Sequence, residues 1–207
     1  MKSLLIGGLA LAFSISPAHA QLSPSASGFS SAPTDASEVE YWTMMRRLGA
    51  CLADSKTAAA QAFLATSPDT DEEGSAFQSL FHRNSNRCMG NFVSASMRRA
   101  YLRGMIAEGL FKQMPEAQRA RGLAKETVVP DAIGSLHDFA QCYVAKHQRD
   151  AIVFLEGTKV ATKGELEAVR HMAADFGPCF PEGKHITINP DSIRMAVAEA
   201  LYRAASR

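Results

Sequence analysis

LRGMIAEGLF at residues 102–111 and IRMAVAEALY at residues 193–202 are two versions of one stretch, 91 residues apart. The cysteines share this spacing, Cys51 with Cys142 and Cys88 with Cys179. One frame therefore aligns both terminal stretches and both cysteine pairs. A fixed internal period is typical of repeat architectures. We interpret the chain as a tandem duplication.

Both stretches have the apolar spacing of an α-helix, and their polar side is narrow. Behind the main apolar stripe lies a second pair four residues apart, Ala107 with Phe111 in the first copy and Ala198 with Tyr202 in the second. Helices that are apolar on both sides are usually buried centrally. We therefore expect the two terminal helices to form the middle of the molecule.

Each copy has three more predicted helices and a short β-prone run. Helical periodicity covers 38–54, 58–65, 131–147 and 150–157. A third helix is signalled by the capping boxes Thr70-x-x-Glu73 and Thr162-x-x-Glu165. Alternation at 91–94 and 185–188 favours strands that pair across the duplication. The expected fold is all-α, a tandem duplication of a four-helix repeat with a minor two-stranded β ribbon linking the copies.

The first twenty residues have the three parts of a secretory signal peptide. Lys2 is the charged start, residues 4–13 form the apolar run, and Ala18-His19-Ala20 matches a small-x-small cleavage site. The run is too short to cross a bilayer, and no second apolar stretch of about 20 residues follows. We expect cleavage between Ala20 and Gln21 and a periplasmic or secreted protein with no transmembrane anchor in the mature chain.

After the signal peptide, the mature chain divides into a leader, two repeats and the connector between them. A leader rich in Ser, Ala and Pro has too little apolar surface to fold, so we expect it to be disordered. The organisation that we predict is signal peptide 1–20, leader 21–36, first repeat 37–113, connector 114–130 and second repeat 131–207. The two repeats are expected to pack as one domain.

Four cysteines in an exported chain predict two disulfides, although four cysteines allow three connectivities. A unit that once folded alone should hold its own bond, which favours Cys51 with Cys88 and Cys142 with Cys179. Each bond closes a loop of nearly forty residues and contributes about 3 to 4 kcal/mol by chain entropy. The close spacing of a redox or zinc motif is absent.

Arg103 and Glu108 recur as Arg194 and Glu199, the only charged residues kept in register. Residues five apart point to different flanks of a helix and do not pair within it. If the terminal helices cross antiparallel about a pseudo-two-fold axis, Arg103 meets Glu199 and Glu108 meets Arg194 as structural ion pairs. The alternatives are a cleft in which Glu and Arg act on an anionic ligand, and solvated helix faces.

The motifs of known catalytic and metal sites are missing. None of the mature histidines (His82, His137, His147, His171 and His185) recurs in both copies. His171 and Asp175 share a helix face as a metal edge, but two ligands do not make a zinc site. HExxH, GxSxG, Walker, dinucleotide and CxxCH patterns are absent. We predict no catalytic, cofactor-binding or metal-binding residues.

Charge is balanced overall and uneven along the chain. With 22 Lys and Arg against 21 Asp and Glu, net charge indicates no partner. The segment 83–125 has nine basic residues against Glu108 and Glu116, so an anionic envelope component or an acidic protein is a candidate partner. Alternatively, the segment faces the acidic second half of its own chain or is solvated. Export and the lack of interleaved aromatics argue against nucleic acid.

These features predict an exported, non-enzymatic helical protein that binds a partner or a ligand in the bacterial envelope. The alternative is a periplasmic enzyme, hydrolase-like, with an unfamiliar active site. An enzyme requires a concave pocket with converging polar groups and perturbed acids. A binding module is expected to present an exposed patch instead.

Overall fold

The computed structural model describes residues 38–81, 86–89, 97–180 and 189–207. Regular structure within these ranges is entirely helical, and no strand occurs in them. The expected signal peptide, the leader and both runs of the expected β ribbon (91–94 and 185–188) lie outside the described residues. No helix in the described ranges combines the length and the apolar character needed to cross a bilayer.

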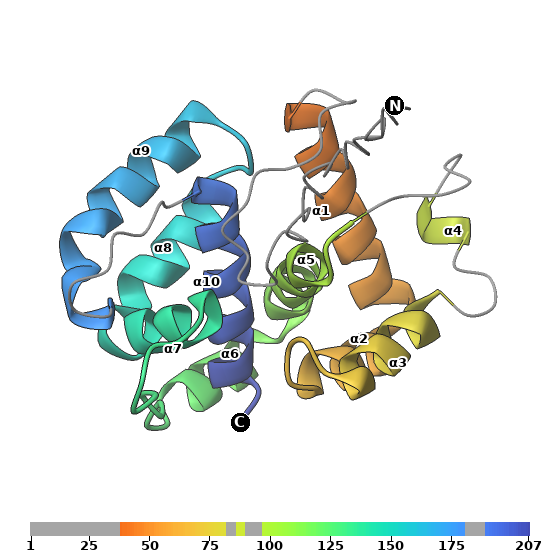
Figure 1. Ribbon diagram of the computed structural model, residues 1–207, viewed down its shortest axis with the longest axis horizontal. Coiled ribbons are helices and arrows are strands. Elements are labelled where there is room, and N and C mark those ends of the chain that lie inside the picture. Colours follow the sequence, from red (N-terminus) through yellow and green to blue (C-terminus); the bar gives the residue numbers. More distant parts are fainter. Residues whose placement is uncertain (1–37, 82–85, 90–96, 181–188) are drawn as a thin grey trace, which may run out of the picture.

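Ten α-helices and two short 3-10 helices are found in the described ranges. They are α1 (Glu38–Ser55), α2 (Thr57–Ala65), α3 (Asp71–Leu80), α4 (Asn86–Met89), α5 (Arg99–Gln113), α6 (Glu116–Leu123), α7 (Leu136–Lys146), α8 (Gln148–Gly157), α9 (Lys163–Met172), η1 (Ala173–Asp175), η2 (Gly177–Cys179) and α10 (Pro190–Ala205) (Figure 1).

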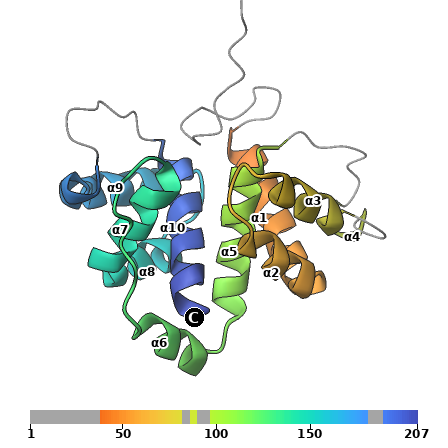
Figure 2. The same ribbon diagram turned by 60° about the horizontal axis from the view of Figure 1, so that its bottom comes forward.

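Helices α5 and α10 lie side by side in the centre of the molecule (Figure 2). Residues 101–111 of α5 are all buried, as are nearly all residues of α10. Helix α1 packs on α5 while α7 packs on α10, and the pairs α2–α3 and α8–α9 flank the two sides. The central burial of the terminal helices, expected from their two apolar sides, is confirmed.

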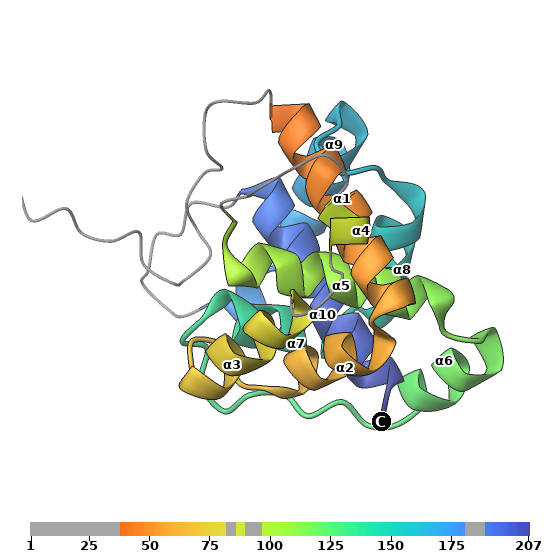
Figure 3. The ribbon, with the colours of Figure 1, turned by 90° about the vertical axis from the view of Figure 1, so that its right-hand side faces the viewer.

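The two helices do not run antiparallel, which was the condition considered for the Arg–Glu pairs. Both begin at the same end of the molecule in Figure 2, and α5 runs across α10 in Figure 3. A glycine lies at their closest approach. A Cβ added to Gly104 would fall 2.4 Å from Met195 Cα, so only a residue without a side chain allows the backbones to cross this closely. These two positions are themselves 91 residues apart.

Helix α7 begins at Leu136 instead of at residue 131. Ser135 is its N-cap: the hydroxyl accepts from the backbone N–H of Asp138, and the Asp138 carboxylate accepts from the backbone N–H of Ser135. This reciprocal capping box satisfies two backbone donors and starts the helix at this point. The Ser-x-x-Asp pattern was available in the sequence but was hidden by apolar periodicity that continues upstream.

The capping boxes predicted for α3 and α9 are half correct. Thr70 and Thr162 accept from the backbone N–H three residues later, as predicted. The glutamates accept from the residue before the cap, Glu73 from Asp69 N and Glu165 from Ala161 N. Asp69 and Ala161 have φ angles of 62° and 56°, the left-handed region that turns the N–H toward the glutamate. One oxygen of each glutamate therefore remains for another partner.

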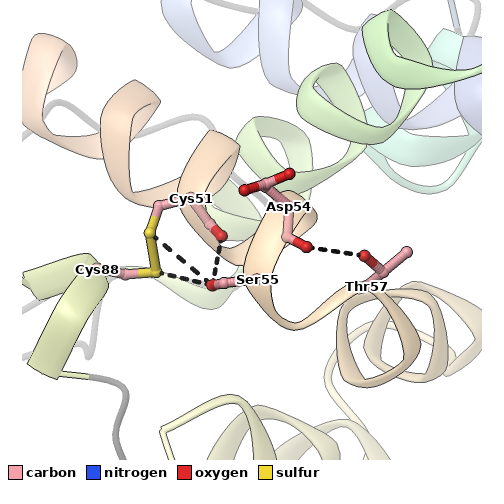
Figure 4. The surroundings of a disulfide bond; sticks show 5 residues. All are labelled: Cys51, Asp54, Ser55, Thr57 and Cys88. Carbon is pink, nitrogen blue, oxygen red and sulfur yellow. Dashed lines mark hydrogen bonds between the residues drawn. A yellow bond between two sulfur atoms is a disulfide. The ribbon is translucent and has the colours of Figure 1, made fainter.

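The disulfides join Cys51 to Cys88 and Cys142 to Cys179, with Cα–Cα distances of 5.5 and 5.7 Å. They tie α1 to α4 and α7 to η2. The first bond is partly exposed, and the Ser55 hydroxyl lies 3.2 Å from Cys88 Sγ while it donates to the Cys51 carbonyl (Figure 4). The second bond is buried, because its cysteines are 2% and 0% exposed. The two bonds therefore differ in access to reductant.

Candidate functional site

Two buried Arg–Glu networks join the central helices. Arg103 of α5 donates from Nη2 to Glu199 Oε1 (2.6 Å) and from Nε to Glu199 Oε2 (3.1 Å). Arg194 of α10 does the same toward Glu108, from Nη2 at 2.8 Å and Nε at 2.9 Å. The structure thus brings together the four charged residues that recur in register. Paired donors facing two carboxylate oxygens are the stronger geometry for an ion pair.

Each arginine also pairs with a second glutamate, one that the capping-box pattern explains only as part of a helix start. Arg103 Nη1 lies 3.2 Å from Glu73 Oε1, and Arg194 Nη1 lies 3.3 Å from Glu165 Oε1. Both glutamates are 1% exposed. The Thr-x-x-Glu pattern that recurs at an offset of 92 residues was the sequence signal for these glutamates as arginine partners. A capping box at the start of a helix was a sufficient explanation of the pattern, so the sequence did not indicate the ion pairs.

Backbone carbonyls complete both arginine sites. Arg103 donates to the carbonyls of Phe63, Leu64 and Thr66 at the end of α2. Arg194 donates to those of Leu155 and Thr158, and to the Thr158 hydroxyl, at the end of α8. Carbonyls at the C-terminal end of a helix have no partners within that helix. The guanidinium groups therefore bind these helix ends as well as the carboxylates.

The networks keep the central carboxylates ionised. Burial raises the pKa of Glu108 and of Glu199, but hydrogen bonds and charge from Arg194 and Arg103 respectively outweigh it and hold each pKa below its usual range. Lys112 and Arg203, one turn further along, lower these values further. For Glu165 burial outweighs Arg194, and its pKa is raised. Glu108 and Glu199 therefore form permanent ion pairs at neutral pH.

A cleft of about 530 Å³ opens beside the first network. Its lining comes from the α2–α3 loop, the start of α5, the start of α7 and one face of α10. Polar and charged lining residues include Ser67, Asp69, Arg103, Ser135, His137, Asp138, Gln141, Ser192, Glu199 and Arg203, while apolar ones include Pro68, Ala100, Tyr101, Leu136, Met195 and Ala196. This volume is in the range of small-molecule sites.

His137 stands on the α7 wall of this cleft. Its Nδ1 lies 3.9 Å from Glu199 Oε1, and its Nε2 contacts the Gln141 amide. Burial lowers the pKa of His137. The charge of Glu199 raises this pKa and the charges of Arg203 and Arg103 lower it, so the net shift is downward. The imidazole is therefore neutral at pH 7. The positions 91 residues earlier are Arg46 and Ala50, so only the second half has this His–Gln pair.

The basic segment 83–125 is largely engaged within the chain. Arg99 pairs with Glu73 at 2.9 Å, and Arg119 pairs with Glu156 at 2.7 Å while its guanidinium lies over the Phe111 ring. Lys112 and Arg103 belong to the two networks. Glu156 and Glu199 belong to the second half of the chain, as one alternative expects, whereas Glu73 belongs to the first half and Glu108 to the segment itself.

His171 and Asp175, which the sequence places on one helix face, lie in different elements, α9 and η1. Asp175 falls in a group with His147 and Asp150, and His171 is not part of that group. His82 and His185 lie outside the described residues. Phe139 and Tyr143 of α7 form an aromatic cluster with Phe176, which follows η1.

Comparison with protein-family models, with curated proteins and with solved structures finds no match to this chain.

Proposed function

We propose that this chain is an exported, non-enzymatic binding protein, and that the cleft beside α7 and α10 holds a small ligand. The cleft itself supports the proposal. Its volume of about 530 Å³ suits a small molecule, and its lining combines polar with apolar side chains. Arg203, His137 and Gln141 offer hydrogen bonds to a ligand, and Tyr101, Leu136 and Met195 are apolar residues of the same lining.

A concave pocket was the feature expected of an enzyme, so the cleft calls for a choice between binding and catalysis. A general acid or base needs a pKa near the working pH. Burial raises the pKa of Glu199, but the hydrogen bond and charge of Arg103, together with the charge of Arg203, bring this pKa below its usual value. The carboxylate already accepts from Arg103 and Arg203. Glu199 is therefore a fixed anion that orients its neighbours. This favours binding over proton transfer.

The enzyme alternative depends on His137. Burial lowers its pKa, so a neutral imidazole faces the cleft and is able to accept a proton from water or a substrate hydroxyl. Turnover of a bound ligand that is abolished in His137→Gln, with binding retained, would establish this alternative.

The duplication belongs to the same proposal. Equivalent positions make equivalent contacts: Arg103 with Arg194, Glu199 with Glu108, Glu73 with Glu165, and Lys112 with Arg203. The two disulfides span the same sequence separation of 37 residues. We infer that an ancestral four-helix unit was copied, and that the second copy acquired the cleft residues His137 and Gln141.

Export to the bacterial periplasm or exterior is the location proposed with this function. The secretory pattern at residues 1–20 and the two disulfides support it, because disulfides persist in oxidising compartments. Cleavage is proposed between Ala20 and Gln21. An anionic envelope component or an acidic protein remains a proposed partner of the segment 83–125, with Arg121 and Lys125 among its exposed cations.

Native mass spectrometry of the mature protein, purified from the organism that makes it, tests the proposal. We expect a small molecule to co-purify and to be released on denaturation. Ala100→Phe, at an exposed position in the cleft wall, should reduce its occupancy, because the ring fills the space. Ala62→Phe, at an exposed position on α2 outside the cleft, is the matched control and should retain the ligand. Equal occupancy in both variants contradicts the assignment of the cleft.

A further inference from the structure

We propose that His147, Asp150 and Asp175 bind a divalent transition-metal ion, with Zn²⁺ the best fit to their donor atoms. One ligand atom from each lies within 4.8 Å of the others. His147 is the residue between α7 and α8, Asp150 is in the first turn of α8, and Asp175 is the last residue of η1. The site is separate from the cleft and does not depend on the proposed ligand binding.

The three ligand atoms lie slightly further apart than they would around a bound zinc ion. Ligand atoms at about 2.0 to 2.2 Å from a tetrahedral zinc lie about 3.3 to 3.6 Å apart, and the separation of His147 Nδ1 from Asp150 Oδ2 is 4.0 Å. Both aspartates are exposed, so rotation of their side chains can close the gap. One imidazole nitrogen with two carboxylate oxygens suits zinc, whereas calcium prefers six to eight oxygens.

The backbone that presents these ligands is held in place. The buried disulfide Cys142–Cys179 ties α7 to η2, four residues beyond Asp175. Phe176, next to Asp175, is buried against Tyr143 with a centroid distance of 5.2 Å. The His147 ring stacks on Tyr143 with a centroid distance of 5.0 Å. The ligand His147 and the neighbour of the ligand Asp175 thus pack against the same tyrosine.

The hydroxyl of that tyrosine is a second, independent sign of a ligand. Tyr143 is fully buried, and its hydroxyl has no hydrogen-bond partner among the described residues. Its ring packs against His147 and against Phe176, the residue that follows Asp175. A buried hydroxyl without a partner is unusual in a folded protein. A metal-bound water between the carboxylates would give it an acceptor.

Only the second half has these donors. The positions 91 residues before His147 and Asp150 are Lys56 and Ala59. The α7–α8 junction is otherwise built like the α1–α2 junction, where Lys56 is the residue between the helices. The donor set is therefore a local addition to a shared scaffold.

Isothermal titration of the untagged, chelator-treated mature protein with ZnCl₂ at pH 7 tests the proposal. We expect one ion per chain, with affinity at least about tenfold weaker in His147→Ala and in Asp175→Asn because each removes a ligand. His171→Ala is the matched control. It removes an exposed histidine of α9, the helix that leads into η1, and should leave the affinity unchanged.

Far-UV circular dichroism and mass mapping of the intact disulfides establish that each variant is folded. Asp150→Asn changes an exposed side chain. It is a third variant that weakens one proposed ligand without altering the core. Absence of 1:1 binding, or equal affinity in the wild type and the three ligand variants, overturns the proposal. Equal weakening in His171→Ala also overturns it, because it would indicate diffuse binding to surface histidines.

Discussion

Replacing Arg194 by Met tests the buried networks most sharply, because the same change at Arg103 is its internal comparison. The Met side chain fills much of the space but removes every hydrogen bond. Glu108 then keeps Lys112, but Glu165 loses the one cation with which it is seen to pair. The Thr158 carbonyl also loses its arginine. Removing one partner of a buried ion pair costs about 3 to 5 kcal/mol, and we expect the upper end.

Arg103→Met should cost less. After this change Glu199 still pairs with Arg203 and Glu73 still pairs with Arg99. The Thr66 carbonyl still accepts from Arg203. Glu73 and the Thr66 carbonyl thus keep a cation in Arg103→Met, whereas their counterparts Glu165 and the Thr158 carbonyl lose theirs in Arg194→Met. A buried group left unpaired costs about 1 to 3 kcal/mol, so we expect the two variants to differ in free energy of unfolding by at least about 1 kcal/mol.

Urea unfolding followed at 222 nm, with disulfides intact, measures both free energies of unfolding. Arg170→Met, at an exposed position on α9, is the control and should change stability by less than about 0.5 kcal/mol. If Arg103→Met proves as damaging as Arg194→Met, or if both resemble the control, the account of the networks is refuted.

Three further predictions concern the crossing of α5 and α10, the buried glutamates and the disulfides. Gly104→Ala should lower the free energy of unfolding by about 1 to 3 kcal/mol or more, because its Cβ would fall 2.4 Å from Met195 Cα, whereas Gly157→Ala, with nothing within 4 Å, should cost nothing in the same urea titration. Glu108 and Glu199 have pKa values below the usual 4.5 in the fold, since burial is outweighed by their arginines; their contribution to stability is therefore present above pH 4.5 and lost as the pH falls below it. Glu199→Gln should be less stable at pH 7 but show a shallower fall in its urea midpoint between pH 6 and pH 3, and an unchanged slope argues against this linkage. Under limiting dithiothreitol the partly exposed Cys51–Cys88 bond should open before the buried Cys142–Cys179 bond; mass mapping of alkylated peptides decides the order, and the reverse order contradicts the difference in access.

The repeat spacing made much of the helical arrangement predictable. Apolar positions at helical spacing located α1, α2 and α8, and the Asn189-Pro190 start of α10 is confirmed, with the Asn189 side chain accepting from the backbone N–H of Asp191 and of Ser192. Disulfide pairing followed from the expectation that each bond lies within one of the two proposed copies. These features depend on local sequence or on the 91-residue spacing, both of which can be seen in a single chain.

Features that depend on three-dimensional placement were not predictable. The direction in which α5 crosses α10 is set by packing around Gly104, and a period of 91 residues carries no information about it. Glu73 and Glu165 were assigned to capping because local chemistry explained them. The cleft brings together residues from four separate elements. In the group His147, Asp150 and Asp175, helix α9 lies between the first two residues and the third in the sequence. Helical spacing relates only residues within one helix, so it indicated His171 as the neighbour of Asp175.

A crystal structure of the mature protein, purified from the organism that makes it, tests the central claim most directly. We predict electron density for a small molecule in the cleft, with its polar end against Arg203 and His137 and its apolar part against Met195. An ordered cleft that holds only water, with a bound molecule or partner density elsewhere on the surface, would contradict it.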